Sequence, residues 1–547
     1  MNKRVLHINP SDNVLVALKD LKKDETIFFD DKEILLQEDI PSKHKIFITA
    51  MKPGDPVYMY GVLVGKVQHD VMKGGRVTTA NTKHAAGPYA YRGAKYNWQP
   101  PDVTKFADRT FNGYHRSDGR VGTANYWIFI PTVFCENRNM DVIREALHNE
   151  LGYAVTDKYK RKTRRLVELY KNGNDFAIAD LSVSESTIDT GRVFKNVDGI
   201  KFLNHQGGCG GIRQDSAILG KLLAAYADHP NVGGVTILSL GCQNLQLPQL
   251  LADIKQRNPA FDKPLYIFEQ QQSQSEEQLI TEAIRQTFLG LVQINKLQRQ
   301  PAPLQRLCVG VKCGGSDGFS GISANPAVGY CADLLVALGA KILLAEFPEL
   351  CGVEQELIDR SVDEATAQKF IHLMKRYEEI VRRVGSGFHM NPSPGNIKDG
   401  LITDAMKSAG AAKKGGTSPV VDVLDYTDPA IKPGLSLVCT PGNDVEATTG
   451  KAASGATIIL FTTGLGTPTG NPVCPVIKLA SNTGLAKKMG DIIDIDTGPI
   501  ITGDASIQQM GEEILEYVIM AASGEVIPKA VQLNQDDFIP WKRGVSL

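Results

Sequence analysis

One stretch decides how this chain folds and works: Lys312-Cys313-Gly314-Gly315-Ser316-Asp317-Gly318-Phe319-Ser320-Gly321. The apolar run 307–311 before it predicts a short buried strand. After it, Asn325 and Pro326 predict the start of a helix that ends at Gly339. The stretch is therefore a glycine-rich loop between a strand and a helix, where open α/β sheets bind ligands. Glycine-rich loops are also common as plain turns, so other strand ends must repeat its chemistry before it indicates a site.

The composition excludes several classes of protein. With 547 residues the chain is too long for one hydrophobic core, so several domains are expected. A net charge of −1 gives no general attraction to nucleic acid or to anionic membranes. The 9 cysteines are odd in number and scattered, which favours reduced thiols or metal ligands over disulfides. The start of the chain lacks a signal-peptide core, and no apolar run is long enough to span a membrane, so we expect a cytoplasmic protein.

The pattern of strands and helices predicts an α/β multidomain protein. Short β-rich runs separated by turn residues indicate a small all-β domain over 1–98, followed by a linker over 99–110. From there strands alternate with helices. This alternation predicts two α/β domains with mostly parallel sheets, a central one over 111–395 and a C-terminal one over 396–547.

Several predicted strands end in the same kind of chemistry. The strand over 199–203 leads to a Gly-Cys-Gly turn, the strand over 232–240 leads to Gly-Cys, and the strand over 341–345 leads to a run with three glutamates. The side chains concerned are His205, Cys209, Cys242 and Glu349. Because parallel strands end at one edge of a sheet, we expect these groups to lie near Lys312 and to form one site with it.

Five motifs together carry a resemblance to a known family. They are Gly-Tyr-His-Arg-Ser-Asp-Gly-Arg-Val-Gly-Thr at 113–123, His205 with Gly-Cys-Gly at 208–210, Lys-Cys-Gly-Gly-Ser-Asp at 312–317, Phe-Thr-Thr-Gly at 461–464 and Gly-Thr-Pro at 466–468. In this order they resemble the altronate/galactarate dehydratase family over nearly the whole chain, and the β-rich N-terminal region resembles the SAF domain, a β-clip module, of that family. The resemblance implies dehydration of D-altronate to 2-dehydro-3-deoxy-D-gluconate in hexuronate catabolism, with galactarate or another sugar acid as the alternative substrate.

The end of the SAF-like region departs from some relatives. They carry His-x-His-Asn there, whereas the aligned residues here are Thr78-Thr79-Ala80-Asn81, with only Asn81 retained. Those histidines cannot be transferred to this chain, and His84 is the candidate that replaces them. The ending Lys83-His84 resembles the altronate branch of the family.

The implied reaction removes a proton next to a carboxylate and expels the neighbouring hydroxyl. It requires a base, an acid, and a metal or cations that stabilise the enediolate. The residues predicted to be catalytic are Lys312, His205, His84 and Asp317. Arg116 and Arg120 present planar forks that suit a carboxylate. The other predicted substrate-binding residues are Asp118, Asn81, Ser316, Thr462, Thr463 and Thr467.

The resemblance implies a divalent metal cofactor. Fe²⁺ is the preferred candidate, and Mn²⁺ is the second candidate. A single ion would draw on His205, Glu349 or Glu354. The second arrangement is an iron–sulfur cluster on Cys209, Cys242 and Cys313, with one iron left open for the substrate. Alternatively, these three cysteines have no role in metal binding and are simply small buried residues at tight turns.

A protein that binds a sugar acid without converting it is the alternative of a different class. Binding alone needs fewer titratable groups than the strand ends carry, which favours the enzyme. We expect a small-molecule substrate, no nucleic-acid partner, and a homo-oligomer, as a dimer.

Overall fold

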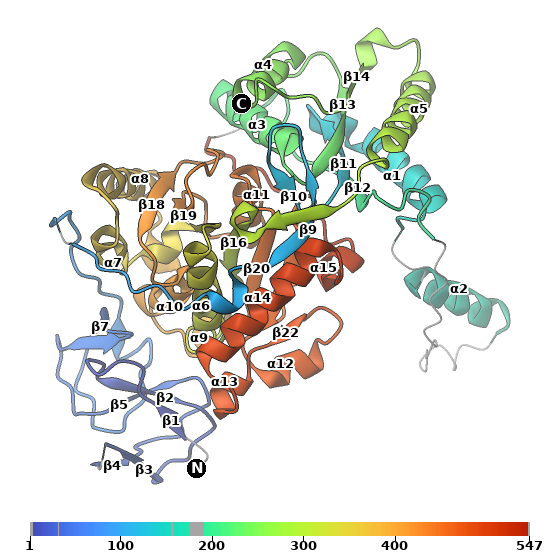
Figure 1. Ribbon diagram of the computed structural model, residues 1–547. Coiled ribbons are helices and arrows are strands. Elements are labelled where there is room, and N and C mark those ends of the chain that lie inside the picture. The colour runs from blue at the N-terminus through green and yellow to red at the C-terminus, as the bar shows by residue number, and fades with distance from the viewer. Residues whose placement is uncertain (1–3, 31, 94, 155–157, 174–190, 545–547) are drawn as a thin grey trace.

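The computed structural model describes residues 4–30, 32–93, 95–154, 158–173 and 191–544 (Figure 1). A small β domain, blue in Figure 1, lies beside a body that contains two parallel sheets. An all-β N-terminal domain followed by two α/β units is the fold class that the sequence predicts.

The N-terminal domain consists of short antiparallel strands. In the β6 strand Val57 and Met59 are buried whereas Tyr58 is exposed, because successive side chains of a strand point to opposite faces. The strands are β1 (Val5–Leu6), β2 (Val14–Ala17), β3 (Thr26–Phe29), β4 (Lys32–Leu35), β5 (Lys45–Phe47), β6 (Pro56–Met59), β7 (Val62–Val67) and β8 (Thr82–Lys83).

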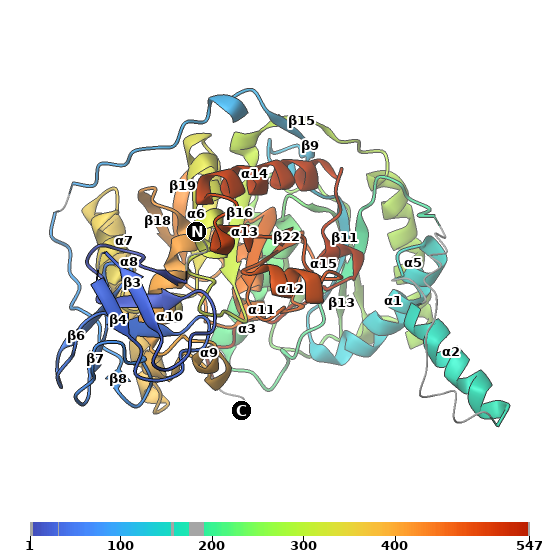
Figure 2. The same ribbon diagram turned by 90° about the horizontal axis from the view of Figure 1, so that it is seen from below.

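An extended strap leads from this domain across the surface of the body (Figure 2). Two aromatic side chains fasten it, since Tyr96 Oη donates to the carbonyl of Thr417 at 2.6 Å and Trp98 Nε1 donates to Thr417 Oγ1 at 3.2 Å. The strap contains one short 3-10 helix, η1 (Thr104–Phe106). It ends in an antiparallel sheet formed by β9 (Thr110–His115), β10 (Val121–Gly122) and β15 (Gln300–Pro303).

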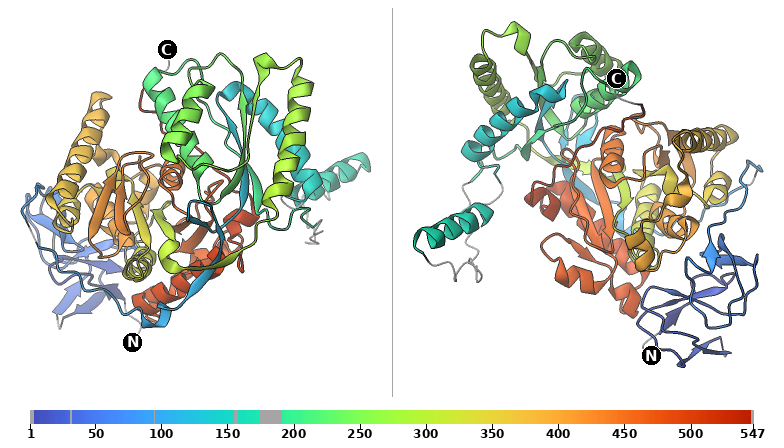
Figure 3. Two further views of the ribbon diagram at one scale, coloured as in Figure 1. Left: turned by 45° about the horizontal axis from the view of Figure 1, so that its top comes forward. Right: turned by 180° about the vertical axis from the view of Figure 1, so that it is seen from behind.

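The first parallel sheet has four strands in the order β12-β11-β13-β14. Its strands are β11 (Tyr126–Pro131), β12 (Gly199–Phe202), β13 (Val232–Ser239) and β14 (Leu265–Glu269). Helices cover both faces (Figure 3), with α1 (Asn137–Leu151) and α5 (Glu276–Ile294) on one face and α3 (Arg213–Asp228) and α4 (Leu247–Arg257) on the other. Helix α2 (Lys158–Lys171) projects away from the body, as expected for its strongly basic sequence (Figure 1).

The second parallel sheet has seven strands in the order β18-β19-β17-β16-β20-β21-β22. They are β16 (Cys308–Cys313), β17 (Lys341–Ala345), β18 (Val420–Leu424), β19 (Gly434–Val438), β20 (Ile458–Thr463), β21 (Val476–Ala480) and β22 (Ile495–Asp496). Strand β16 lies at the centre, so the glycine-rich loop that begins at Lys312 leaves the central, fully buried strand of the larger sheet.

Helices α6 (Ala324–Ala337) and α14 (Ile507–Ser523) pack together on one face of this sheet, and α11 (Asp444–Ala453) packs against β16 and also against α3. The contact between α11 and α3 joins the two sheet units through one hydrophobic core. The remaining helices are α7 (Glu354–Asp359), α8 (Glu364–Arg383), α9 (Pro394–Lys398), α10 (Asp404–Ala412), α12 (Thr483–Lys488), α13 (Pro499–Thr502) and α15 (Lys529–Gln532).

Two details of the sequence prediction are corrected by these pairings. A domain boundary at 395 would cut the seven-stranded sheet, because β16 and β17 pair with strands from the last third of the chain. The structure places the boundary before β16 instead. Helix α6 begins two residues earlier than predicted, with Ser323 at the N-cap position. The side chain of Asn325 does not cap it but accepts a hydrogen bond from Thr462 Oγ1 at 2.6 Å.

Within the described part of the chain, no helix is both long and apolar enough to cross a membrane.

Candidate active site

Lys312 lies at the end of β16 and is fully buried. Its ammonium group donates to the Glu346 carboxylate and, at 2.6 Å, to the carbonyl of Cys313, and it forms an ion pair with Asp444 Oδ1 at 2.8 Å. Glu346 follows β17 directly, and Asp444 is the first residue of α11. Three segments that are distant in sequence therefore bring their charges together at the carboxyl edge of the larger sheet.

A second set of charges continues from Cys313, the neighbour of Lys312. The ammonium of Lys414 donates to Cys313 Sγ at 3.2 Å, and Cys313 Sγ lies 3.6 Å from Glu349 Oε2. Glu349 in turn forms an ion pair with Lys407 at 2.9 Å. We call the whole group the buried charge cluster; its members are Lys312, Cys313, Glu346, Glu349, Lys407, Lys414, Asp444 and Lys451.

Electrostatics divide the lysines of this cluster into two kinds. Burial alone would lower the pKa of Lys312, but Glu346, Asp444 and Glu349 outweigh it and raise the pKa well above its usual value. Lys312 is therefore a permanent cation. Burial lowers the pKa of Lys451 to about 8, and Glu346 offsets only part of this effect. Lys451 Nζ lies 3.6 Å from Glu346 Oε1 and makes no hydrogen bond within the described residues, so it can give up or take a proton near neutral pH.

The backbone of Glu346 is strained. Its φ of 75° lies in the left-handed region, which side chains other than glycine seldom adopt. The amide N–H of Glu346 donates to Thr440 Oγ1 at 3.1 Å and holds this conformation in place. Strain of this kind collects at functional sites, and here it turns the carboxylate toward Lys312.

Asp444 is the most exposed carboxylate of the cluster, with 29% of its side chain accessible to solvent. The loop after β16 must be glycine where it passes this residue, because a Cβ at Gly314 would lie 2.5 Å from Asp444 Oδ1. The glycine-rich sequence that drew attention to this loop thus leaves room for a carboxylate.

A possible metal-binding group lies where the N-terminal domain meets the body. One ligand atom each from His84, Cys351 and Asp404 falls within 4.8 Å of the others. Asp404 Oδ2 is buried without a hydrogen-bond partner among the described residues, and burial raises the pKa of this carboxyl to about 8. Imidazole, thiol and carboxylate suit a divalent transition metal. Lys407, one turn along α10 from Asp404, connects this group to the buried charge cluster.

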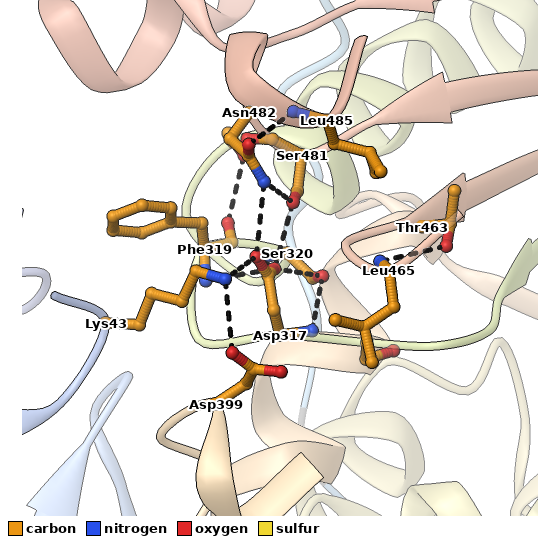
Figure 4. A network of polar contacts seen from close by, with 12 residues as sticks. Lys43, Asp317, Phe319, Ser320, Asp399, Thr463, Leu465, Ser481, Asn482 and Leu485 are labelled. Carbon is orange, nitrogen blue, oxygen red and sulfur yellow. Dashed lines mark hydrogen bonds and ion pairs between the residues drawn. The ribbon is translucent and has the colours of Figure 1, made fainter. Parts of the chain in front are cut away.

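Asp317, which the sequence predicts to be catalytic, is held by contacts with several parts of the structure (Figure 4). Its Oδ1 accepts hydrogen bonds from Ser320 Oγ at 2.8 Å and from Ser481 Oγ at 2.9 Å, and its Oδ2 forms an ion pair with Lys43 at 3.0 Å. Lys43 also pairs with Asp399 at 3.3 Å. Lys43 belongs to the N-terminal domain, so Asp317 fixes that domain to the loop after β16.

The predicted carboxylate-binding arginines lie at the amino edge of the four-stranded parallel sheet. Arg116 donates to the carbonyls of Pro230 and Ala124, which precede β13 and β11. Arg120 pairs with Asp118 and, at 2.6 Å, with Asp228. These contacts fasten the β9–β10 hairpin to the amino ends of the strands, away from the strand ends that carry His205 and Cys209.

The other predicted substrate-binding residues also have internal partners. Thr463 Oγ1 accepts the amide N–H of Gly466 at 2.9 Å and shapes the turn after β20. Asn81 Nδ2 donates to the carbonyl of Arg76 at 2.7 Å. Ser316 is buried, Thr462 bonds Asn325, and the carbonyl of Thr467 accepts from Lys478 Nζ at 2.9 Å.

The smaller sheet has its own polar carboxyl edge. His205 follows β12 and is 4% exposed, with Gly207 N–H donating to Nδ1 at 3.0 Å and Nε2 donating to the carbonyl of Pro131 at 2.8 Å. Burial lowers the pKa of His205, so the ring is neutral. Cys209 and Cys242 are exposed on this edge, whereas Cys313 is buried in the other sheet, so the predicted group of three is divided between two sheets.

A cavity of about 620 Å³ lies beside this edge. The loop around Cys209 forms one wall, and Glu446 together with the C-terminal segment 538–542 forms another. Glu446 is in the first turn of α11, two residues after Asp444. The cavity therefore adjoins the carboxyl edge of the smaller sheet and the helix that brings Asp444 to Lys312.

Sequence reasoning missed the lysines of the buried charge cluster that come from helices or from the segment after them. Lys407 and Lys451 lie inside α10 and α11, and Lys414 follows α10. A buried helical lysine has no distinctive local pattern. Glu346 and Asp444 each come directly after a strand or its loop, and that position is the one signal that pointed to them.

Three family models match successive parts of the chain. Residues 3–85 match the altronate/galactarate dehydratase SAF domain, residues 113–295 match the D-galactarate dehydratase/altronate hydrolase second domain, and residues 304–546 match the D-galactarate/altronate dehydratase C-terminal domain. An altronate dehydratase of Bacillus subtilis is 32% identical to this chain over 100% of both proteins. The chain belongs to the altronate/galactarate dehydratase family.

Two further relatives are enzymes of Escherichia coli. An altronate dehydratase is 32% identical over 99% of both chains, and a galactarate dehydratase (L-threo-forming) is 30% identical over 95% of this chain and 93% of its own. The second and third family domains meet between residues 295 and 304, where the structure divides the two parallel sheets. The domains of the altronate/galactarate dehydratase family are thus the structural units of this chain.

Proposed function

We propose that this chain is an altronate dehydratase, which removes water from D-altronate to give 2-dehydro-3-deoxy-D-gluconate. The observation that carries the proposal is the match to two altronate dehydratases over essentially their whole length. The buried charge cluster supports it, because an elimination next to a carboxylate needs fixed cations and groups that exchange protons.

The reaction breaks the C–H bond at C2 and the C–O bond at C3, and it forms a C=C bond whose enol becomes the 2-keto group. The proton and the hydroxide leave as water, so no oxidant or reductant is needed. A proton beside a carboxylate is very weakly acidic, so negative charge that builds up on the substrate must be stabilised. We place the substrate in the cavity that Glu446 lines. Asp444, two residues before Glu446 in α11, is the carboxylate of the buried charge cluster that is nearest to Glu446 along the chain.

In this arrangement Asp444 exchanges protons with the substrate, and Lys312 behind it holds it in place and keeps positive charge close. Lys451 and Glu346 can hold a proton inside the protein and release it again, because the pKa of Lys451 is about 8 and burial raises the pKa of Glu346. His205 has both ring nitrogens engaged by backbone groups, so it shapes the cavity wall.

The donor set of His84, Cys351 and Asp404 fits the divalent metal that the family resemblance implies. A bound Fe²⁺ or Mn²⁺ would supply Lewis-acid stabilisation of negative charge and would join the N-terminal domain to α10. We expect His84→Ala to lower the divalent-metal content of dialysed protein, whereas His69→Ala, an exposed histidine of the same domain, leaves it unchanged. Equal metal content in both variants would show that the ion does not bind to His84, Cys351 and Asp404.

The test of the function is an assay of the purified protein under anaerobic conditions with Fe²⁺ and, in parallel, D-altronate or galactarate. We expect a 2-keto acid from D-altronate at a higher kcat/KM than from galactarate. A preference for galactarate would favour the second candidate function, which the 30% identity to a galactarate dehydratase supports. No product from either acid would refute dehydration.

The homodimer and the cytoplasmic location remain proposals. Light scattering of the purified protein checks the first, and fractionation of cells that express the tagged protein checks the second.

A further inference from the structure

The exposed cysteines of this chain all lie at one edge. Among its nine cysteines, Cys135, Cys209 and Cys242 are exposed, and the other six are buried or half-buried. Cys135 follows β11, Cys209 follows β12 and Cys242 follows β13, which are three adjacent parallel strands. An exposed free thiol is unusual in a folded protein and is open to oxidation. Three of them at the ends of neighbouring strands require an explanation.

The three loops that carry these cysteines contact one another. The amide N–H of Phe134, next to Cys135, donates to the carbonyl of Gly207 at 2.8 Å. Asn244, two residues after Cys242, donates from Nδ2 to the carbonyl of Cys209 at 3.0 Å and to that of Gly211 at 2.9 Å. The Cys209 loop therefore lies between the other two and is bonded to both.

Glycine around Cys209 permits this close approach. A Cβ at Gly208 would lie 2.8 Å from the ring of Phe134, so a larger residue would push the Cys135 loop away. A Cβ at Gly211 would make an ordinary van der Waals contact, 3.5 Å from the carbonyl oxygen of Gly208. The same glycines line the cavity of about 620 Å³. The loop that carries Cys209 thus borders a space large enough for an inorganic group and a small acid.

A single metal ion does not fit these three thiols. Within the described residues, the one group of ligand atoms lying within 4.8 Å of one another is that of His84, so the three sulfurs are too widely spaced to share an ion. His205, the nearby imidazole, has both nitrogens occupied by hydrogen bonds and cannot complete a four-ligand site. An iron–sulfur cluster has iron and sulfide atoms between its ligands and so accepts thiolates that lie further apart.

We propose that Cys135, Cys209 and Cys242 bind a [4Fe–4S] cluster whose fourth iron has no protein ligand and faces the cavity. Cys135 thus takes the place that Cys313 was predicted to hold. The natural ligand of the open iron is a small hydroxy acid, which offers hydroxyl and carboxylate oxygens. The iron–sulfur cluster is inferred from the three cysteines alone. Only the choice of a hydroxy acid as its ligand rests on the proposed function.

The test is anaerobic reconstitution of the whole protein with iron and sulfide, followed by measurement of bound iron, labile sulfide and the electron paramagnetic resonance spectrum of the reduced protein. We expect about four sulfides per chain and about four iron atoms in addition to any iron bound at His84, Cys351 and Asp404. Cys135→Ser, Cys209→Ser and Cys242→Ser should each lose most of the sulfide and the spectrum. Cys331→Ala, which alters a buried thiol inside α6 that belongs to neither proposed metal site, is the control and should retain both.

Because the three cysteines are exposed, their serine variants should keep the circular dichroism and the melting temperature of the wild-type apoprotein. No labile sulfide in the reconstituted wild type, or equal sulfide in the wild type and the three variants, would overturn the proposal. Addition of altronate should shift the spectrum of the reduced cluster, and an unchanged spectrum would overturn the choice of ligand. A cluster in a protein without dehydratase activity would refute the proposed function and leave the site standing.

Discussion

Replacing Lys312 by methionine tests the buried charge cluster most directly. Methionine is also an unbranched chain and fills most of the same space, but it removes the ammonium group that contacts Glu346, Asp444 and the carbonyl of Cys313. Glu346 would then keep Lys451, at 3.6 Å, and the more distant Lys414 as compensating charges. The variant therefore leaves a fully buried carboxylate that is poorly paired.

The size of the effect follows from this geometry. Removing one partner of a buried ion pair typically costs about 3–5 kcal/mol. Burial has already raised the pKa of Glu346, so this carboxyl takes up a proton readily and relieves part of the cost. We therefore expect a loss of about 3 kcal/mol in the free energy of unfolding of the C-terminal unit. Loss of the cation should also lower kcat by about 10²-fold or more.

The assay combines denaturant unfolding with steady-state kinetics at a temperature where circular dichroism shows the variant folded. Lys312→Met with Glu346→Gln is the matched control, because it removes the uncompensated charge as well. The double variant should recover part of the stability but none of the activity. If Lys312→Met has wild-type stability and full dehydration activity, the role given to this lysine is wrong.

Three further predictions concern neighbouring contacts. Gly314→Ala should displace Asp444 and reduce kcat with little change in the melting temperature, checked by kinetics and thermal unfolding. Lys43→Met removes the ion pair with Asp317 and should weaken docking of the N-terminal domain by about 2 kcal/mol, seen as faster hydrogen exchange at the interface; unchanged exchange would contradict it. Burial lowers the pKa of Lys45 to about 7, so its contribution to stability should be lost as pH falls through about 7 and be complete only above its unfolded pKa of about 10.5. Lys45→Met should flatten the rise in unfolding midpoint between those pH values, and parallel curves for variant and wild type would refute this.

The sequence by itself determined the local structure and the family. The apolar run before Lys312 and the helix after it are both present, and strands alternate with helices as the pattern predicts. These features depend on neighbours along the chain, because strand and helix periodicity are local properties. The family motifs likewise needed no knowledge of contacts.

Only the tertiary structure decided which strand ends meet. The chain builds two parallel sheets, so Cys209 and Cys313 lie on different edges, although both follow a strand with the same kind of turn. Arg116 follows a strand of a third, antiparallel sheet, and it holds the amino ends of the parallel strands. Strand order is set by pairing between residues far apart in sequence, and local patterns contain no information about it.

The same reason explains why the ion pairs of Lys312 could not be predicted. A charge buried inside a protein is tolerated only beside partners of opposite charge, and the partners of Lys312 are 34 residues away at Glu346 and more than a hundred away at Asp444. The sequence shows the lysine and each carboxylate separately. The folded chain brings them within hydrogen-bonding distance, and that proximity gives the glycine-rich loop its chemistry.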